Sequence, residues 1–426
     1  MAGQLRKLAA NLALLGVASL FALTLSEGAV RIIRHRPTVP GANVIRVEPD
    51  TLLGWIKKAN FEGVRYAPRE YTIHESFNSR RIRGPEYPLA KPDGEYRILV
   101  LGDSFAQGYT VEFEDLFSEV MKKALNASGG RPVQVINAGT AGWSTDQELL
   151  WFRRDGVAYD PDLVILLFYG NDINSNGSDR YWRGRKPWFE LVGDSTDAHL
   201  ELRGVPVPAG PPPTEEVPGL DAGESAGHPG GLKGFLTRHS MLYRDVTRIV
   251  KSSPQAFKLA RALRLTRETQ PQRLAIPLEW DVWRTESRAD VRRDWRITEA
   301  LLEELQNAVR ASGAKLLVAH VPAREAVHDW AWVVTRQTFR MERSDFAVNL
   351  DEYGLRRICV DQRLECHFLR EDFEPLLLPG GAARRQDLYF HWDRHWTALG
   401  NRFAGEAIAR AVRERFLDAE NLHAGS

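Results

Sequence analysis

Short apolar runs alternate with helical patterns from Tyr96 to the carboxyl terminus. Each run is nearly uninterrupted in its apolar character, as buried parallel strands are; the runs span residues 97–101, 133–136, 163–168 and 315–321. The segments with helical spacing of apolar residues span residues 115–127, 145–152, 296–311 and 397–416, and Thr397 stands where it can cap the last one. Strands that alternate with helices predict a doubly wound parallel sheet.

The composition is that of an ordinary globular protein. Of 426 residues, 43% are hydrophobic and 27% are charged, which excludes a chain that is disordered throughout. The 57 Lys and Arg residues balance 56 Asp and Glu residues, so nothing indicates a nucleic-acid partner. Two cysteines exclude a disulfide-dense scaffold and a four-cysteine zinc site.

The amino terminus departs from this pattern. Residues 8–25 carry no charge and follow Arg6 and Lys7, which is typical of a signal peptide or a signal anchor. No small-x-small cleavage site precedes Glu27, and this favours an uncleaved transmembrane anchor within residues 1–36. The alternative is a buried core helix. Because Arg residues follow the span as well, charge hardly distinguishes its two sides; we expect the main domain to face outward, in the periplasm or the extracellular space.

Residues 37–94 show no long periodic pattern of apolar residues and are interpreted as an extension wrapped on the main domain. The main domain spans residues 95–426. An insertion at about residues 180–290 interrupts that domain. Within it, residues 204–234 are rich in Pro, Gly and Ser and are not expected to join a sheet. They fit either a disordered loop or a lid beside the site.

Three strand-end loops carry the polar residues of greatest interest. The first run ends in Gly102-Asp103-Ser104, the second in residues 137–142 and the third in residues 170–172. Because ligands bind at the carboxyl ends of parallel strands, these loops are expected to meet at one edge of the sheet. Glycine amides, an Asn side chain and the Ser104 amide would together form an oxyanion hole there.

A serine nucleophile needs a base and an acid that orients it. His395 is the candidate base and Asp393 the nearest candidate acid, just ahead of the last helix. His391 and Asp387 are the alternatives. Taken alone, each of these residues also fits an ordinary surface position.

In order along the chain, residues 102–104, 137–142 and 170–172 and the Asp393-x-His395 pair resemble the sequence blocks of the SGNH (GDSL-type) hydrolases. The resemblance covers roughly residues 95–415. It implies a three-layer, flavodoxin-like α/β fold and ester hydrolysis through an acyl-enzyme, with Ser104 as nucleophile. Gly142 and Asn171 would complete the oxyanion hole, and His395 would be the base.

Three features resemble a bacterial, membrane-anchored branch of that family: the amino-terminal anchor, the run from Asn78 to Pro85 before the first strand, and the Asp-x-His-Trp-Thr ending. The usual final block has Asp three residues before His, whereas Asp393 stands two before His395. This spacing resembles alginate O-acetyltransferase-like proteins.

The remaining features add little chemistry. Cys359 and Cys366 fit either a disulfide, which an exported domain permits, or two free buried thiols. The histidines at 74, 239 and 320 have no metal-ligand spacing, so we predict no metal and no cofactor.

The expected activity is that of a serine esterase that cleaves an acyl ester, with an acetylated envelope carbohydrate as the substrate that the resemblance suggests. One alternative is an acetyltransferase that passes the acyl group to a polysaccharide. The other is a non-catalytic envelope protein that binds polysaccharide in the same cleft.

Overall fold

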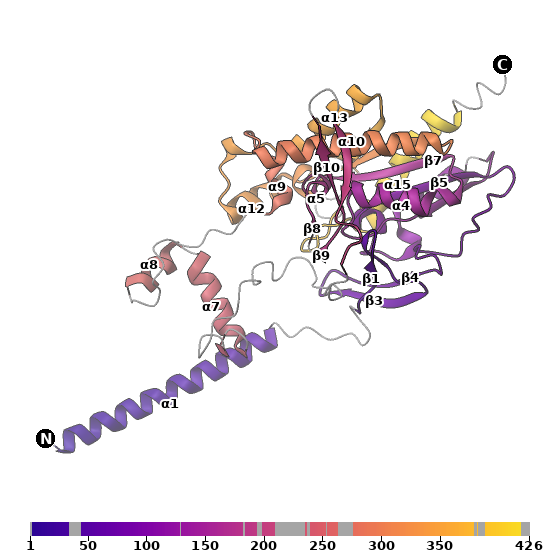
Figure 1. The fold of residues 1–426 in the computed structure, drawn as a ribbon. Helices are drawn as coiled ribbons and strands as arrows, with labels where there is room; N and C mark the ends of the chain where they lie inside the picture. The colour runs from indigo at the N-terminus through magenta and orange to yellow at the C-terminus, as the bar shows by residue number, and fades with distance from the viewer. Residues whose placement is uncertain are drawn as a thin grey trace. The chain divides into compact units, whose positions relative to one another are not determined.

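The computed structural model describes residues 2–33, 44–127, 129–181, 184–193, 198–208, 235–236, 239–252, 254–262, 276–378, 381 and 388–418. The chain divides into two compact units, of which the first comprises residues 1–38 and 221–275 and the second the remainder (Figure 1). Each unit is described separately.

The first unit is helical. Its described helices are α1 (Ala2–Ile33), α7 (Met241–Ser252) and α8 (Pro254–Ala262). The carboxylate of Glu27 in α1 accepts hydrogen bonds from the amides of Met241 and Leu242 at the start of α7. Residues 14–31 of α1 have a mean hydropathy of 1.4 and none of this window is buried. Its length and composition fit a signal anchor or a transmembrane span.

The second unit is built on a five-stranded parallel sheet, which confirms the predicted α/β fold. The strand order is β13-β12-β7-β5-β6, the flavodoxin-like order, and the topological switch point lies between β5 and β7. The strands are β5 (Tyr96–Gly102), β6 (Val133–Asn137), β7 (Leu163–Tyr169), β12 (Lys315–Val321) and β13 (Glu365–Phe368).

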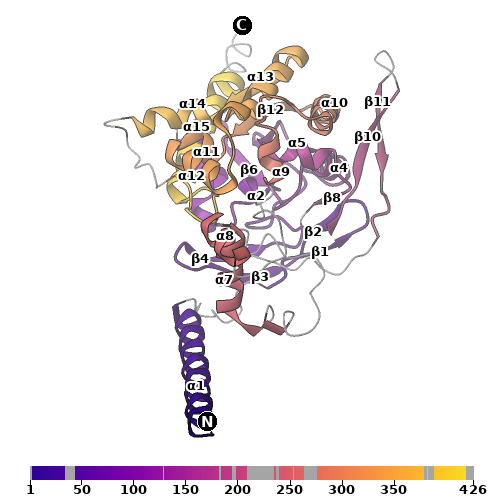
Figure 2. The ribbon, with the colours of Figure 1, turned by 90° about the vertical axis from the view of Figure 1, so that its left-hand side faces the viewer.

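Helices cover both faces of this sheet. Figure 2 shows α14 and α15 on one side of the sheet and α4, α5 and α10 on the other. The main helices are α3 (Phe117–Ala127), α4 (Thr145–Arg154), α5 (Asn171–Asn176), α10 (Ala289–Ala311), α13 (Leu350–Gln362), α14 (Leu369–Leu377) and α15 (Ala398–Val412). Shorter helices are α2 (Ser104–Gln107), α9 (Leu278–Asp281), α11 (Arg324–Val327) and α12 (Asp329–Phe339). Single turns of other helix types are η1 (Phe113–Asp115), η2 (Gly156–Tyr159), η3 (Arg343–Asp345) and η4 (Arg413–Leu417).

Alternate residues of the central strands enter two separate cores. Leu99 and Leu101 of β5 lie in the core under α4 and α10, whereas Ile98 and Val100 lie in the core under α3 and α15. All four are fully buried or nearly so. A strand buried on both faces has no polar side, and this explains the uninterrupted apolar runs in the sequence.

Small antiparallel hairpins lie outside this sheet. They are formed by β1 (Val47–Asp50) with β2 (Gly54–Lys57), β3 (Phe61–Ala67) with β4 (Tyr71–Phe77), β8 (Arg180–Tyr181) with β9 (Gly184–Arg185), and β10 (Trp188–Val192) with β11 (His199–Arg203). The first two belong to a segment that we call the hairpin layer, residues 44–83. The layer buries charged side chains almost completely, including Arg46, Lys57, Glu75 and Arg83.

The predicted elements agree closely with the observed ones in the sheet and less well outside it. Thr397 caps α15, accepting a hydrogen bond from the Gly400 amide, as predicted. The long helix begins at Ala289 instead of Arg296. The strand β13 and the hairpin layer were not predicted as strands. Of the Pro-rich segment, residues 209–234 lie outside the described residues.

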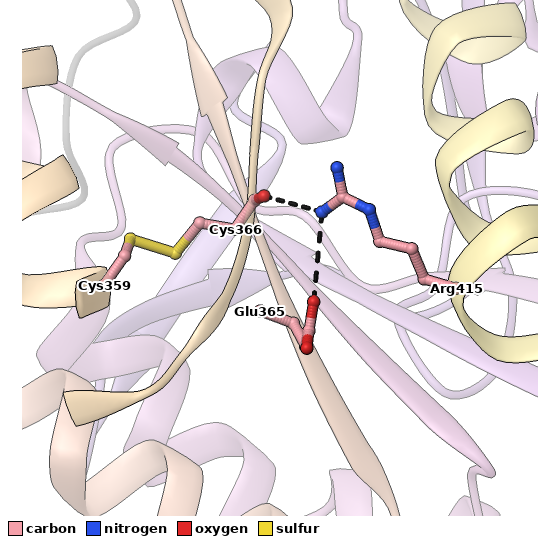
Figure 3. The surroundings of a disulfide bond; sticks show 4 residues. All are labelled: Cys359, Glu365, Cys366 and Arg415. Carbon is pink, nitrogen blue, oxygen red and sulfur yellow. Dashed lines mark hydrogen bonds and ion pairs between the residues drawn. A yellow bond between two sulfur atoms is a disulfide. The ribbon is translucent and has the colours of Figure 1, made fainter.

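Cys359 and Cys366 form a disulfide, so the structure selects one of the two alternatives left by the sequence. Figure 3 shows that this bond joins the end of α13 to the edge strand β13. On the other side of β13, the Arg415 guanidinium donates to the Cys366 carbonyl over 2.7 Å and lies 4.0 Å from the Glu365 carboxylate.

Candidate active site

Ser104 is the first residue of α2, directly after the central strand β5. Gly102 ends that strand with φ +148°, and a Cβ there would lie 2.6 Å from the Cβ of Ala106, so only glycine fits this turn. Asp103 caps the short helix by accepting the Phe105 amide over 2.8 Å. The turn therefore places Ser104 at the carboxyl edge of the sheet, beside the switch point.

His395 and Asp393 complete a hydrogen-bonded chain with Ser104. The Nε2 atom of His395 lies 2.7 Å from Ser104 Oγ, and its Nδ1 atom lies 2.6 Å from Asp393 Oδ1. The far oxygen of Asp393, Oδ2, accepts the Tyr71 hydroxyl over 2.6 Å. Serine, imidazole and carboxylate are thus connected in the order that nucleophilic catalysis by serine requires.

The charges within this chain support one another. Burial opposes ionisation of both His395 and Asp393, but the opposite charge of the partner outweighs burial in each case. The Asp393 carboxylate raises the pKa of His395, and the imidazole lowers the pKa of Asp393. The Tyr71 hydroxyl lowers the pKa of Asp393 further. Asp393 is therefore an ionised acceptor that can stabilise a protonated His395.

Asn171 lies beside Ser104 through a shared partner. The Oδ2 atom of Asp103 lies 3.3 Å from both Ser104 Oγ and Asn171 Nδ2, and Asn171 Nδ2 also lies 3.2 Å from the Tyr181 hydroxyl. These are long contacts, so the amide can exchange one of them for a stronger acceptor. The structure brings Asn171, which opens α5 after β7, close to Ser104, which follows β5.

Gly142 belongs to the loop after β6, and the hairpin layer holds this loop. The Ala141 amide donates to Gln107 Oε1 over 2.7 Å, and Gln107 Nε2 donates to Glu75 Oε1 over 2.6 Å. Lys57 Nζ donates to the Gly139 carbonyl over 2.7 Å. Gly142 itself has φ +80°, a conformation that favours glycine. The loop is thus fixed to α2 on one side and to buried charges on the other.

Two family models match this chain. The model described as the GDSL-like lipase/acylhydrolase family matches residues 100–340, more than half of the chain. The chain belongs to this family. A second model, described as the SGNH hydrolase-like domain of the acetyltransferase AlgX, matches residues 282–424. These matches confirm the resemblance drawn from the sequence blocks, and with it the assignment to the SGNH serine hydrolases.

Several solved structures are similar to this SGNH hydrolase. An acetyl xylan esterase, AlAXEase, is 14% identical over 74% of this chain and 99% of its own, with a TM-score of 0.36. A lipase/acylhydrolase from Enterococcus faecalis is 12% identical over 75% and 96%, with a TM-score of 0.35. A two-domain esterase active on acetylated mannans is 12% identical over 75% and 50%, with a TM-score of 0.36. None of the curated proteins matches the chain.

A group of buried acids in this SGNH hydrolase interacts electrostatically with Asp103, the residue before Ser104. Burial, followed by the charges of neighbouring carboxylates, raises the pKa of Glu148 and of Asp172 well above the ordinary values. Burial raises the pKa of Asp146, and this effect is partly offset by Lys186, which donates a hydrogen bond to it. Within the part of the chain that the structure describes, no group of three or more His, Cys, Asp or Glu side chains is arranged to hold a metal ion.

Of the predicted site residues, the structure brings Ser104, Asp393 and His395 into contact and places Asn171 beside them. Gly142 lies in the loop that Gln107 and Glu75 hold. The alternative base, His391, is exposed and stacks on Trp330. The alternative acid, Asp387, lies outside the described residues.

Three further contacts of the site were not predicted from the sequence. Tyr71 donates to Asp393, the Tyr109 hydroxyl lies 3.0 Å from His395 Nδ1, and Glu70 accepts the Asp393 amide over 2.9 Å. Each of these residues is about 300 positions away from its partner, so no local motif joins them. Only information that links pairs of distant positions could have indicated these contacts.

Proposed function

We propose that this SGNH hydrolase is a serine esterase that cleaves acyl esters, acetyl esters above all, on a carbohydrate of the cell envelope. The observation that carries the proposal is the hydrogen-bonded chain from Asp393 through His395 to Ser104. These three residues lie at the switch point of the sheet, which is where open α/β folds bind ligands.

The geometry supports the following steps. Ser104 Oγ attacks the ester carbonyl while its proton passes to His395 Nε2, and Asp393 Oδ1 stabilises the imidazolium at Nδ1. The amides of Ser104 and Gly142 and the side chain of Asn171 hold the oxyanion. His395 then protonates the leaving alcohol. Water, deprotonated by His395, releases the acid from Ser104.

A second candidate is an O-acetyltransferase, because the AlgX match covers residues 282–424 and so includes Asp393 and His395. Both activities begin with the same acyl-enzyme. In the transferase, a sugar hydroxyl replaces water as the group that attacks it. Exclusion of water from the site favours transfer, and an open, hydrated site favours hydrolysis.

The test compares the purified full-length protein with Ser104→Ala. Acetate release from p-nitrophenyl acetate is followed with and without oligosaccharide acceptors, and the sugars are examined by mass spectrometry. We expect serine-dependent acetate release that acceptors leave unchanged. Acetylated sugar formed at the expense of acetate would identify the transferase. Equal signals from both proteins would contradict catalysis by Ser104 and favour the polysaccharide-binding alternative.

We further propose that α1 anchors the protein in the membrane and that the hydrolase unit lies on the outer side. The apolar window of residues 14–31 and the disulfide between Cys359 and Cys366 support this placement, because disulfides persist in oxidising compartments. Protease added to intact spheroplasts should digest the hydrolase unit. Protection until the membrane is permeabilised would contradict the outward orientation.

A further inference from the structure

The turn that joins β3 to β4 touches the segment that carries the proposed catalytic acid. Glu70 in that turn accepts the backbone amides of Trp392 and Asp393, the latter over 2.9 Å. Tyr71, the next residue, packs edge-on against the Phe390 ring with the centroids 5.2 Å apart. The hairpin layer therefore holds the backbone of this segment as well as one of its side chains.

The Tyr71 hydroxyl is aimed at the one carboxylate oxygen that His395 does not use. It lies 2.6 Å from Asp393 Oδ2, while Asp393 Oδ1 lies 2.6 Å from His395 Nδ1. Burial and the nearby Asp393 charge raise the pKa of Tyr71, so its hydroxyl stays protonated and donates to the carboxylate. A hydrogen bond to a charged acceptor is short and strong.

The contact of Tyr71 matters because only one residue separates the proposed acid from the proposed base. Arg394 has φ +71°, the left-handed conformation that non-glycine residues rarely adopt, and it separates Asp393 from His395 by a single position. A strained two-residue step does not by itself fix the carboxylate plane against the imidazole. The hydrogen bond from Tyr71 to Oδ2 restricts rotation about the Cβ–Cγ bond, and it is much shorter than the 3.4 Å contact between the Tyr109 hydroxyl and Oδ1.

We propose that Tyr71 is a positioning residue of the hydrolase: it fixes the Asp393 carboxylate so that Oδ1 stays directed at His395. The inference rests on the proposed serine mechanism and adds a residue that lies before the stretch matched by either family model. Tyr71 touches neither the nucleophile nor the substrate carbonyl in this scheme. It acts through Asp393 alone.

The test uses Tyr71→Phe in the full-length protein, with Tyr389→Phe as the matched control. Tyr389 is a buried tyrosine whose hydroxyl donates over 2.7 Å to the Pro322 carbonyl, away from Asp393. With p-nitrophenyl acetate, Tyr71→Phe should lower kcat by about 10-fold while KM is unchanged, as expected for loss of a hydrogen bond to a charged group. Tyr389→Phe should leave kcat unchanged.

A purely structural role is separated by a double mutant. In an Asp393→Ala background, Tyr71→Phe should cause no further loss of kcat, because the acceptor is gone. The same loss in both backgrounds would overturn the proposal, as would an unchanged kcat in the single variant. Proton NMR provides a second readout: the His395 Nδ1 proton should shift in Tyr71→Phe and stay in place in Tyr389→Phe.

Ser104→Ala in the same assay keeps the two proposals apart. If Ser104→Ala is inactive while Tyr71→Phe has wild-type kcat, the serine mechanism stands and the role of Tyr71 falls. If Ser104→Ala is as active as the wild type, both fall.

Discussion

The central sheet and the hairpin layer serve the same site by different means. The strands of the sheet are mostly apolar, and strands β5 and β7 bring Ser104 and Asn171 together through the positions of their carboxyl ends. The hairpin layer buries charges and reaches the site through side chains: Lys57 contacts the loop after β6, Glu75 contacts Gln107 of α2, and Tyr71 contacts Asp393. One region determines where the site lies, and the other determines how its groups are oriented. Substitutions in the sheet should therefore lower stability alone, whereas substitutions in the hairpin layer should lower activity as well.

The largest effect is expected from Glu75→Gln in the hairpin layer. Burial opposes ionisation of Glu75, but Arg65, Arg83 and Arg46 lower its pKa, and the Arg46 Nε atom lies 2.8 Å from it. Loss of the charge leaves buried guanidinium groups uncompensated, at a cost of about 3–5 kcal/mol in the free energy of unfolding.

Glu75→Gln should also lower kcat, because Gln107 loses its charged partner and the loop that carries Gly142 loosens. Urea unfolding and ester hydrolysis measure the two effects, with Glu62→Gln, an exposed position on β3, as control. Loss of stability with kcat unchanged would contradict the idea that the hairpin layer orients the groups of the site.

A comparable loss of stability without loss of activity is expected for Leu99→Ala. Leu99 is fully buried in β5, and its truncation should lower the free energy of unfolding by about 2–5 kcal/mol. Because Leu99 contacts no site residue through a polar group, kcat per folded molecule should stay within about twofold of the wild type. Urea unfolding and active-site titration check both values. A fall in kcat as large as in Glu75→Gln would remove the distinction between the regions.

The last effect concerns pH and accumulates gradually from one pH unit to the next. Burial, partly offset by Glu75, lowers the pKa of Lys57 to about 7, whereas an unfolded lysine has a pKa of about 10.4. Between these values the unfolded chain binds more protons than the folded one, so stability should rise with pH by up to ~1.4 kcal/mol per unit. Lys57→Met should lose this rise. Urea unfolding between about pH 7.5 and 9.5 tests it, since tyrosines begin to titrate above that range. Equal slopes in both proteins would show that Lys57 is not the group responsible.

How far the sequence predicts the structure differs between the same two regions. The sheet strands were predictable because their apolar runs reflect burial on both faces, and Ser104 and Asn171 followed from strand ends. The hairpin layer was not predictable as strands, because Arg46, Lys57 and Glu75 interrupt any apolar alternation. Their contacts, such as that of Lys57 with the Gly139 carbonyl, join positions far apart in the sequence. The edge strand β13 is short and contains Glu365, Cys366 and His367, so it lacks the apolar signal of its neighbours.

The site is formed by residues that are far apart in the order of synthesis. Tyr71 and Asp393 are separated by 322 positions, and Ser104 and His395 by 291. A ribosome completes Ser104 and the hairpin layer long before it reaches Asp393 and His395, the proposed acid and base. The unfinished chain therefore carries a serine without its base. We predict that premature termination or carboxyl-terminal proteolysis ahead of residue 393 removes the proposed acid and base together, so the proposed ester cleavage requires nearly the whole chain to be made and folded.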